Sequence, residues 1–128
     1  MMHTSTWEDQ RELKCIFPVI YSVPSVEIER VHPLQQESVC RIYRELHGDP
    51  RVVAVVLFGS SVNLRCTLRS DLDLAVRLNE EFVNRETKNE ISERIQEACN
   101  WNADILWYDR IREGSRIYCN ILKGVQIV

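Results

Sequence analysis

A run of branched apolar residues that ends in a glycine constrains this chain more than any other feature. Residues 52–58 include four valines and pass into Gly59 and Ser60. Valine favours a strand because its branched side chain packs well on a pleated surface, and a Gly-Ser pair suits a turn. A second apolar run begins with Asp71 and Asp73. In a strand, these two side chains would share one face, about 6.6 Å apart at Cα.

Two carboxylates close together at the start of an apolar strand are electrostatically unfavourable unless a positive charge lies near them. Asp71 and Asp73 would repel each other, and burying either one is costly without a countercharge. A divalent cation supplies that charge, and Mg²⁺ is held by one or two carboxylates together with substrate phosphates. The preceding turn offers backbone N–H groups and the Ser60 hydroxyl to a phosphate. The combination predicts a site for metal-dependent nucleotidyl transfer.

The two carboxylates also have structural interpretations. Asp71 lies in a stretch with turn chemistry, so it would serve as a turn residue. Asp73 lies among core-like residues, but it would also suit a surface ion pair with Arg69 or Arg77. Both interpretations remain open at the level of the sequence.

The residues between the two runs are open to similar alternatives. Gly59 would serve any turn that needs a positive φ, and Ser60 would cap a short helix. Both roles are compatible with phosphate binding, because a helix N-terminus is itself an anion site. Arg65 and Arg69 would either meet a triphosphate or remain solvated loop cations.

The arrangement resembles the DNA polymerase β-like nucleotidyltransferase superfamily. Its signature is an apolar residue, glycine and then glycine or serine, followed after a spacer by an aspartate, an apolar residue, a second acid and another apolar residue. Residues 58–60 and 71–74 match this signature. Residues 57–76 look most like the minimal nucleotidyltransferases, the small stand-alone members, and the resemblance covers about residues 33–128.

The resemblance implies both a fold and a reaction. The fold is α/β (α+β), a small mixed sheet with helices packed on it. The reaction is transfer of a nucleoside monophosphate, AMP, from a nucleoside triphosphate to an acceptor hydroxyl, with two Mg²⁺ ions. Asp71 and Asp73 would be catalytic metal ligands, and Gly59, Ser60 and Arg69 would bind the nucleotide.

Asp104 lies in a third apolar run, where a strand core would favour an apolar residue. It matches the third aspartate that this superfamily commonly places on the strand beside the paired carboxylates. Its implied role is general base for the acceptor hydroxyl, or ligand to a second metal ion. The alternative is a solvent-facing strand acid. Trp101 and Trp107 are expected to be packing residues, with Trp107 alternatively flanking a base.

Two positions depart from the pattern of the minimal nucleotidyltransferases. Many members carry arginine directly after the serine of the Gly-Ser pair and glycine four residues after that serine. This chain has Ser61 and Leu64 there. Leucine gives the loop less backbone freedom than glycine, so we expect a different or weaker triphosphate cradle.

Capping residues divide the rest of the chain into elements. Pro33 suits the start of a helix and Gly48 suits its end. Asn79 is expected to cap a long helix that carries Glu90 and Arg94 as an i,i+4 pair. The expected strands are 52–58, 71–77, 102–108 and 125–128, and the expected helices are 33–47, one from residue 79 to about residue 99, and 113–122.

Composition narrows the class of protein. The 128 residues are 45% apolar and 27% charged, which predicts one soluble domain. No apolar run approaches the roughly 18 residues that span a bilayer, and the polar start is unlike a signal peptide, so we expect a cytoplasmic protein. A net charge of −3 gives no basic footprint for nucleic acid. Five scattered cysteines argue against disulfides and zinc.

The chain is divided into an N-terminal extension, residues 1–32, and a minimal nucleotidyltransferase domain, residues 33–128. The extension has apolar pieces at 15–17 and 19–21, which would be short extended segments interrupted by proline. These are more apolar residues than a free polar tail would carry. We therefore expect the extension to pack against the domain or across an interface.

The resemblance leaves the acceptor open. Larger relatives place a second helical domain over the acceptor, and this chain has no room for one. Acceptor recognition is therefore expected from a homo-oligomer, from a separate small helical partner or from the extension. The alternative function is that of an antitoxin-like interaction module, which binds a small helical HEPN-type toxin and in some relatives AMPylates it.

Overall fold

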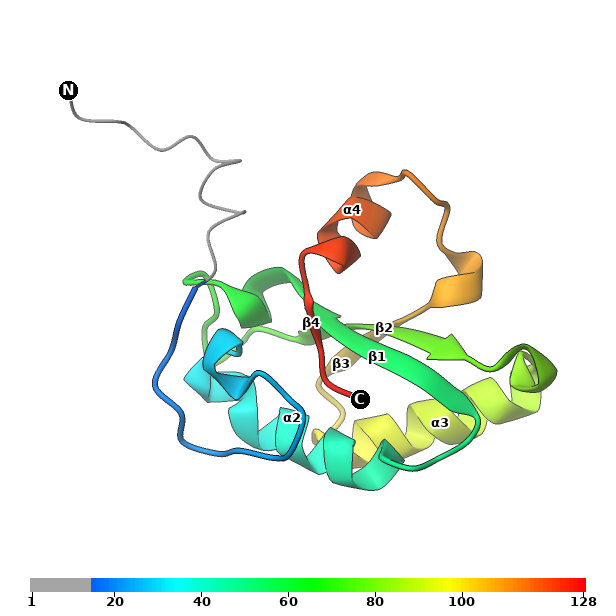
Figure 1. The fold of residues 1–128 in the computed structure, drawn as a ribbon, viewed down its shortest axis with the longest axis horizontal. Helices are drawn as coiled ribbons and strands as arrows, with labels where there is room; N and C mark the ends of the chain where they lie inside the picture. Colours follow the sequence, from blue (N-terminus) through cyan, green and yellow to red (C-terminus); the bar gives the residue numbers. More distant parts are fainter. Residues whose placement is uncertain (1–14) are drawn as a thin grey trace.

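The computed structural model describes residues 15–128, which form one mixed sheet with helices on both faces (Figure 1). This is the fold class predicted from the sequence. In chain order, the elements are η1 (Ile28–Arg30), α2 (Pro33–Leu46), β1 (Val52–Phe58), η2 (Gly59–Val62), β2 (Leu72–Leu78), η3 (Glu80–Phe82), α3 (Arg85–Ala98), β3 (Ala103–Trp107), η4 (Tyr108–Arg110), α4 (Arg116–Leu122) and β4 (Val125–Gln126), where η marks a 3₁₀ helix.

The sheet has the strand order β3-β2-β1-β4. Strand β1 pairs antiparallel with β2 and with β4, whereas β2 and β3 run parallel. A parallel pair needs a crossover connection, and α3 supplies it. Strand β2 therefore lies between β1 and β3, and its side chains have neighbours on both sides.

The two faces of β2 have different surroundings. Leu72, Leu74 and Val76 are buried in the main core, which lies between the sheet and the helices α2 and α3. Ala75 points to the other face, where it packs with Phe58 and with Ile121 of α4. In Figure 1, α2 and α3 accordingly lie on one side of the sheet and α4 on the other. Asp73 has the same parity as Ala75 and therefore belongs to the α4 face.

Helix α2 begins at the predicted residue and ends one residue before the predicted end. Pro33 occupies the first helical position, and the His32 side chain accepts a hydrogen bond from the Leu34 N–H at 3.2 Å. The helix ends at Leu46, and Gly48 follows with φ +85°. A side chain at that φ would be strained, so glycine suits the chain reversal.

The expected cap of the long helix is wrong by five residues. Asn79 caps only η3, where its side chain accepts from the Glu81 N–H at 3.3 Å. Helix α3 begins at Arg85, and the cap is Asn84, which accepts from the Thr87 N–H at 2.8 Å. Both asparagines therefore act as caps, the first for a single 3₁₀ turn and the second for the long helix.

The expected Glu90–Arg94 pair is also replaced by other contacts. Glu90 pairs with Arg51 at 3.0 Å, and Arg94 pairs with Glu45 at 3.0 Å and with Asp49 at 2.8 Å. An i,i+4 pair on an exposed helix contributes only about 0.3–0.5 kcal/mol. Partners on α2 and on the following loop displace it because α3 packs against them.

Residues 15–32, which we call the strap, run over α2 and join no sheet. Phe17, Ile28 and Val31 are buried. The fully buried Gln36 of α2 binds the strap backbone, accepting from the N–H of Ile20 at 2.7 Å and donating to carbonyl oxygens of the strap. The strap therefore packs against the domain. Residues 1–14, the rest of the expected extension, lie outside the described residues.

Within the described residues, no helix is long and apolar enough to cross a bilayer.

Candidate functional site

The paired aspartates lie at the start of β2. Asp71 is exposed and immediately precedes the strand, whereas Asp73 is half-buried within it. Leu72 and Leu74, which flank Asp73, are fully buried in the main core. Strand alternation therefore directs the Asp73 carboxylate to the opposite face of the sheet.

Asp104 lies beside Asp73 on the neighbouring strand. The parallel register pairs Leu72 with Ala103 and Asp73 with Asp104. Paired residues on adjacent strands share a face, and their backbones lie about 4.8 Å apart. Asp104 is exposed. The structure thus brings together the two carboxylates that were predicted from separate apolar runs.

Gly59, directly after β1, lies against the Asp73 carboxylate on the side of β2 that faces away from β3 and Asp104. It follows Phe58, the residue of β1 that pairs with Asp73. Its φ is +75°, and a Cβ at this position would come within 2.4 Å of Asp73 Oδ2. A side chain here would displace the carboxylate. Glycine is therefore needed both for the turn and for the position of Asp73.

The electrostatics of Asp73 are those of a carboxylate without a countercharge. Its pKa is raised, first by burial and then by the negative charges of Asp104 and Asp71. The ion pairs formed among residues 15–128 include none of these three aspartates. Arg77, a candidate partner in the sequence, lies over the Tyr108 ring at 5.5 Å instead. A bound cation would stabilise the ionised form of Asp73.

The carboxylates suit a metal ion that is shared with a substrate. No group of three histidine, cysteine or acidic side chains in the described part of the chain converges closely enough to hold a metal alone. Mg²⁺, however, usually keeps several waters and takes one or two carboxylates plus substrate phosphates. The parallel register places Asp73 beside Asp104, and Asp71 lies two residues before Asp73, so the three carboxylates gather at one end of β2 and β3. The residues present therefore fit a divalent ion.

The turn after β1 differs from the expected cap. The 3₁₀ helix η2 begins at Gly59, so Ser60 is half-buried inside its first turn rather than at a capping position. Ser61 is fully buried, its hydroxyl lies 3.4 Å from the Asp71 carbonyl oxygen, and its own carbonyl accepts from the His32 N–H at 2.8 Å. The position that holds arginine in many relatives is thus a packing position here.

The loop that joins η2 to β2 carries the remaining predicted residues. Arg69 is exposed, and its N–H donates to the Thr67 hydroxyl at 3.2 Å. Leu64 is 82% exposed, so it does not fill the space beside Gly59. Arg65 is also exposed on this loop. The structure places these side chains on the connection between the two halves of the motif.

The α3–β3 turn was not expected to contribute to the site. Asn100 and Trp101 both have positive φ, 56° and 61°. Trp101 is 67% exposed, so the expectation that it packs is wrong. The next residue, Asn102, donates from its side-chain amide to the Ser70 carbonyl at 3.0 Å. No local pattern signals this contact, because its partner is 32 residues away.

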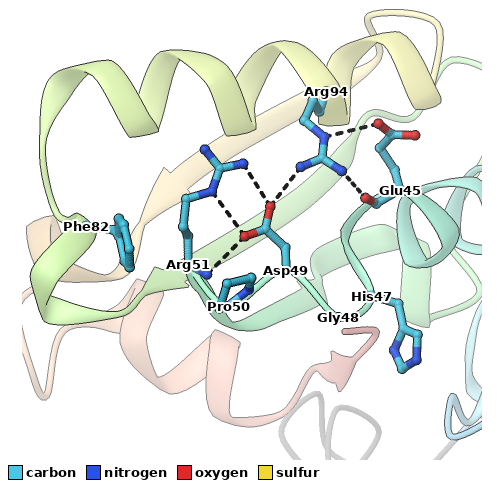
Figure 2. A pocket seen from close by; sticks show the side chains of 8 residues that line it. All are labelled: Glu45, His47, Gly48, Asp49, Pro50, Arg51, Phe82 and Arg94. Carbon is cyan, nitrogen blue, oxygen red and sulfur yellow. Dashed lines mark hydrogen bonds and ion pairs between the residues drawn. The ribbon is translucent and has the colours of Figure 1, made fainter.

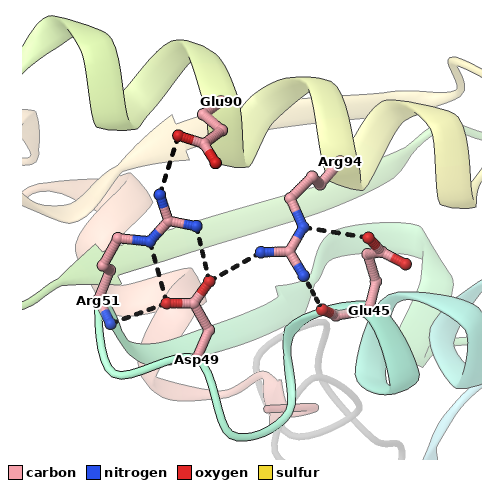
Figure 3. Close-up of polar contacts among 5 residues, drawn as sticks. All are labelled: Glu45, Asp49, Arg51, Glu90 and Arg94. Carbon is pink, nitrogen blue, oxygen red and sulfur yellow. Dashed lines mark hydrogen bonds and ion pairs between the residues drawn. The ribbon is translucent and has the colours of Figure 1, made fainter.

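A second place with clustered charges lies at the other end of β1. It is an open hollow of about 510 Å³ lined by Glu45, His47, Gly48, Asp49, Pro50, Arg51, Phe82 and Arg94 (Figure 2). Asp49 accepts from Arg51 Nε at 3.0 Å, from Arg51 Nη2 at 2.8 Å and from Arg94 Nη1 at 2.8 Å (Figure 3). The charged groups that line this hollow are therefore bound to one another.

Comparison with known families matches residues 41–128 to the family described as polymerase beta, nucleotidyltransferase. The chain belongs to this family. The match covers β1, the Gly-Ser turn and all three aspartates, so the family resemblance predicted from the sequence is confirmed. Members of this family generally use a divalent metal ion.

Solved structures with a similar fold include two toxin–antitoxin complexes. One is a toxin–antitoxin with AMP-PNP, with a TM-score of 0.53 and 19% identity over 70% of this chain and 72% of that one. The other is a tri-AMPylated Shewanella oneidensis HEPN toxin in complex with an MNT antitoxin, with a TM-score of 0.50 and 21% identity over 73% and 71%. At these identities the likeness shows the fold. The search of curated protein sequences gave no match.

Proposed function

We propose that residues 33–128 form the catalytic domain and transfer AMP from ATP to an acceptor hydroxyl. The observation that carries this proposal is the register of β2 and β3, which sets Asp73 directly beside Asp104, with Gly59 against the Asp73 carboxylate. Three elements thus contribute to one uncompensated negative site. Such a site suits a substrate that brings its own cations, as a metal-bound triphosphate does.

Each aspartate has a proposed role. Asp71 and Asp73 would hold Mg²⁺, with two ions when ATP is present, and Asp104 would take the proton from the acceptor hydroxyl or ligate the second ion. The acceptor oxygen attacks the α-phosphorus, and pyrophosphate leaves. A bound divalent ion supplies positive charge to the triphosphate and lowers the pKa of a nearby hydroxyl. Asp104 is exposed, so an incoming acceptor has access to it.

The turn and loop residues would hold the triphosphate. Gly59 and Ser60 would offer backbone N–H groups and a hydroxyl, and Arg69 would add a positive charge. All three lie on the connection that leads from β1 to Asp71. Leu64, which is exposed, would give this cradle less backbone freedom than a glycine at the same position.

The acceptor that best fits these observations is a hydroxyl on a protein partner. The described domain has no helical layer beyond α4 on the face that carries the aspartates. A similar fold occurs in an antitoxin that is bound to an AMPylated HEPN toxin. A small helical partner of this kind, which the chain would bind and AMPylate, is therefore the favoured acceptor, and a second copy of the chain is the alternative.

The proposal is tested by incubating the protein with Mg²⁺, candidate acceptors and ATP labelled at either the α- or the γ-phosphate. We expect the acceptor to take up the α label but not the γ label, because pyrophosphate leaves. Asp73→Asn should lose this transfer. The matched control is Asp109→Asn, which removes an acid that pairs with Lys88. Transfer of the γ label, or equal transfer by Asp73→Asn, would contradict the proposal.

A further inference from the structure

The Ser70 carbonyl joins three separate elements directly before Asp71. It accepts from the side-chain amide of Gln35 on α2 at 2.9 Å and from that of Asn102 at 3.0 Å. The Ser70 hydroxyl and N–H are bound within their own turn, to the Thr67 N–H and the Thr67 carbonyl. Every polar group of Ser70 therefore has a partner, and the end of the loop is fixed.

Asn102 holds the chain on both sides of Asp71. Its side chain donates to the Ser70 carbonyl, and its own carbonyl accepts from the Leu72 N–H at 2.9 Å. Asp71 lies before the first residue of β2, so the sheet ladder alone does not fix it. Asn102 is also two residues before Asp104 in the chain. One residue thus ties the backbone of Asp71 to the strand that carries Asp104.

The other side of this connection is anchored to α3. The Gln96 side chain accepts from the Ala103 N–H at 3.2 Å and donates to the Ala103 carbonyl at 2.8 Å, and the Gln96 carbonyl accepts from the Trp101 N–H at 2.7 Å. The turn that presents Asn102 is therefore held to the helix at two points. Movement of Asn102 relative to β3 is restricted.

Gln35 supports Asp71 from the opposite layer. It is only 4% exposed, so its amide would be costly to bury without a partner. Its neighbour Gln36 is also buried, but that side chain binds the strap. Two adjacent buried glutamines therefore support different parts of the molecule, one the aspartate loop and the other the strap.

We propose that Gln35 and Asn102 are positioning residues for Asp71. They hold the backbone of Asp71 in the place from which its carboxylate would act with Asp73 and Asp104 on one metal-bound triphosphate. This role rests on the proposed function, because it assigns a purpose to the position of Asp71. Residues that orient a metal ligand through hydrogen bonds usually change metal affinity about 10- to 100-fold when they are replaced.

The test compares two substitutions of the same chemistry at adjacent positions. Gln35→Met and Gln36→Met each replace a buried amide with an apolar side chain of similar length, and Asn102→Ala removes the second donor to Ser70. We measure the melting temperature without metal, and the Kd of Mn²⁺ with a non-hydrolysable ATP analogue on the full chain at a temperature where each variant is folded.

We expect Gln35→Met and Asn102→Ala to weaken metal-dependent nucleotide binding about 10-fold or more. Gln36→Met should lower the melting temperature most, because it removes several strap contacts, and should leave the Kd within about twofold of the unsubstituted protein. A Kd that follows melting temperature across all three variants, or that stays unchanged in the first two, would overturn the positioning role. Absence of metal-dependent binding in the unsubstituted protein would instead overturn the proposed function, and the positioning role with it.

Discussion

Two buried or half-buried aspartates at opposite ends of β1 have opposite environments. Asp49 precedes β1, its side chain is 9% exposed, and Arg51 and Arg94 bind it. Its pKa is held below the ordinary range, chiefly by the hydrogen bonds from Arg51. Asp73 pairs with the last residue of β1, and its pKa is raised by burial and by its acidic neighbours.

The difference separates a structural carboxylate from a ligand-binding one. Asp49 is neutralised within the protein, and its contacts join the loop after α2 to α3. Asp73 is left without a countercharge inside the described domain, which costs folding free energy unless a cation arrives. Replacing Asp49 with asparagine should therefore lower the free energy of unfolding, whereas replacing Asp73 with asparagine should raise it or leave it unchanged.

The largest expected effect is on catalysis. Asp104→Asn should lower nucleotidyl transfer about 10²- to 10⁴-fold, because a lost general base acts on the chemical step. Binding of metal and ATP should change much less, since Asp71 and Asp73 remain. Single-turnover transfer and equilibrium binding of an ATP analogue measure the two effects. Unchanged transfer would return Asp104 to the role of a solvent-facing strand acid.

Asp49→Asn should give the largest loss of stability. The change keeps the shape of the side chain but replaces the carboxylate shared by Arg51 and Arg94 with a neutral amide that has one acceptor oxygen, at a cost of about 2–4 kcal/mol. Urea unfolding without metal measures this loss, and affinity for the ATP analogue should stay the same. For comparison, Asp109→Asn, which removes a side chain that is 34% exposed and pairs with Lys88, should cost no more than about 0.5 kcal/mol. Equal losses in both variants would remove the special role of Asp49.

Gly59→Ala should weaken nucleotide binding through Asp73. Alanine at a positive φ costs about 1–2 kcal/mol of stability, and its Cβ would also displace the Asp73 carboxylate. Gly48→Ala is the matched control, because Gly48 has φ +85° and nothing within 4 Å of an added Cβ. Both variants should lose similar stability, but only Gly59→Ala should lose affinity for the metal–ATP analogue. Equal affinities would contradict the proposed contact.

Much of this site is visible in the sequence because its signals are local. The valine run, the Gly-Ser turn and the alternation around Asp73 fix two strands and the face of the carboxylate. The place of Asp104 has no local signal: the family resemblance put it on the strand beside the paired aspartates, and the parallel register of β2 and β3 pairs it with Asp73.

The contacts that the sequence does not reveal join distant residues. Gln35 and Asn102 meet Ser70 across 35 and 32 positions. An amide carries no periodic signal that would identify such a partner. The start of α3 differs from the predicted one because Asn79 and Asn84 are the same residue type, and each of them caps an element.

Acid pH should act on the two carboxylates in opposite directions. The pKa of Asp49 lies below its ordinary 3.8, so its stabilising effect is full above 3.8 and is lost as the pH falls through the lower folded-state value. The pKa of Asp73 lies above 3.8, so protonation above 3.8 relieves repulsion and adds stability as the pH falls. Urea midpoints without metal should rise slightly as the pH falls toward 3.8 and should fall at lower pH. The rise should vanish in Asp73→Asn, and its persistence there would assign it to another group.

The most direct test of the account is the pair of effects of Asp73→Asn on unfolding and on binding. Without metal, the variant should be as stable as the unsubstituted protein or more stable, by on the order of 1 kcal/mol, because it removes an uncompensated charge. Its Kd for Mn²⁺ with an ATP analogue should rise at least about tenfold. A variant that is destabilised like Asp49→Asn and still binds the metal–nucleotide normally would show that Asp73 is a structural carboxylate and contradict the account.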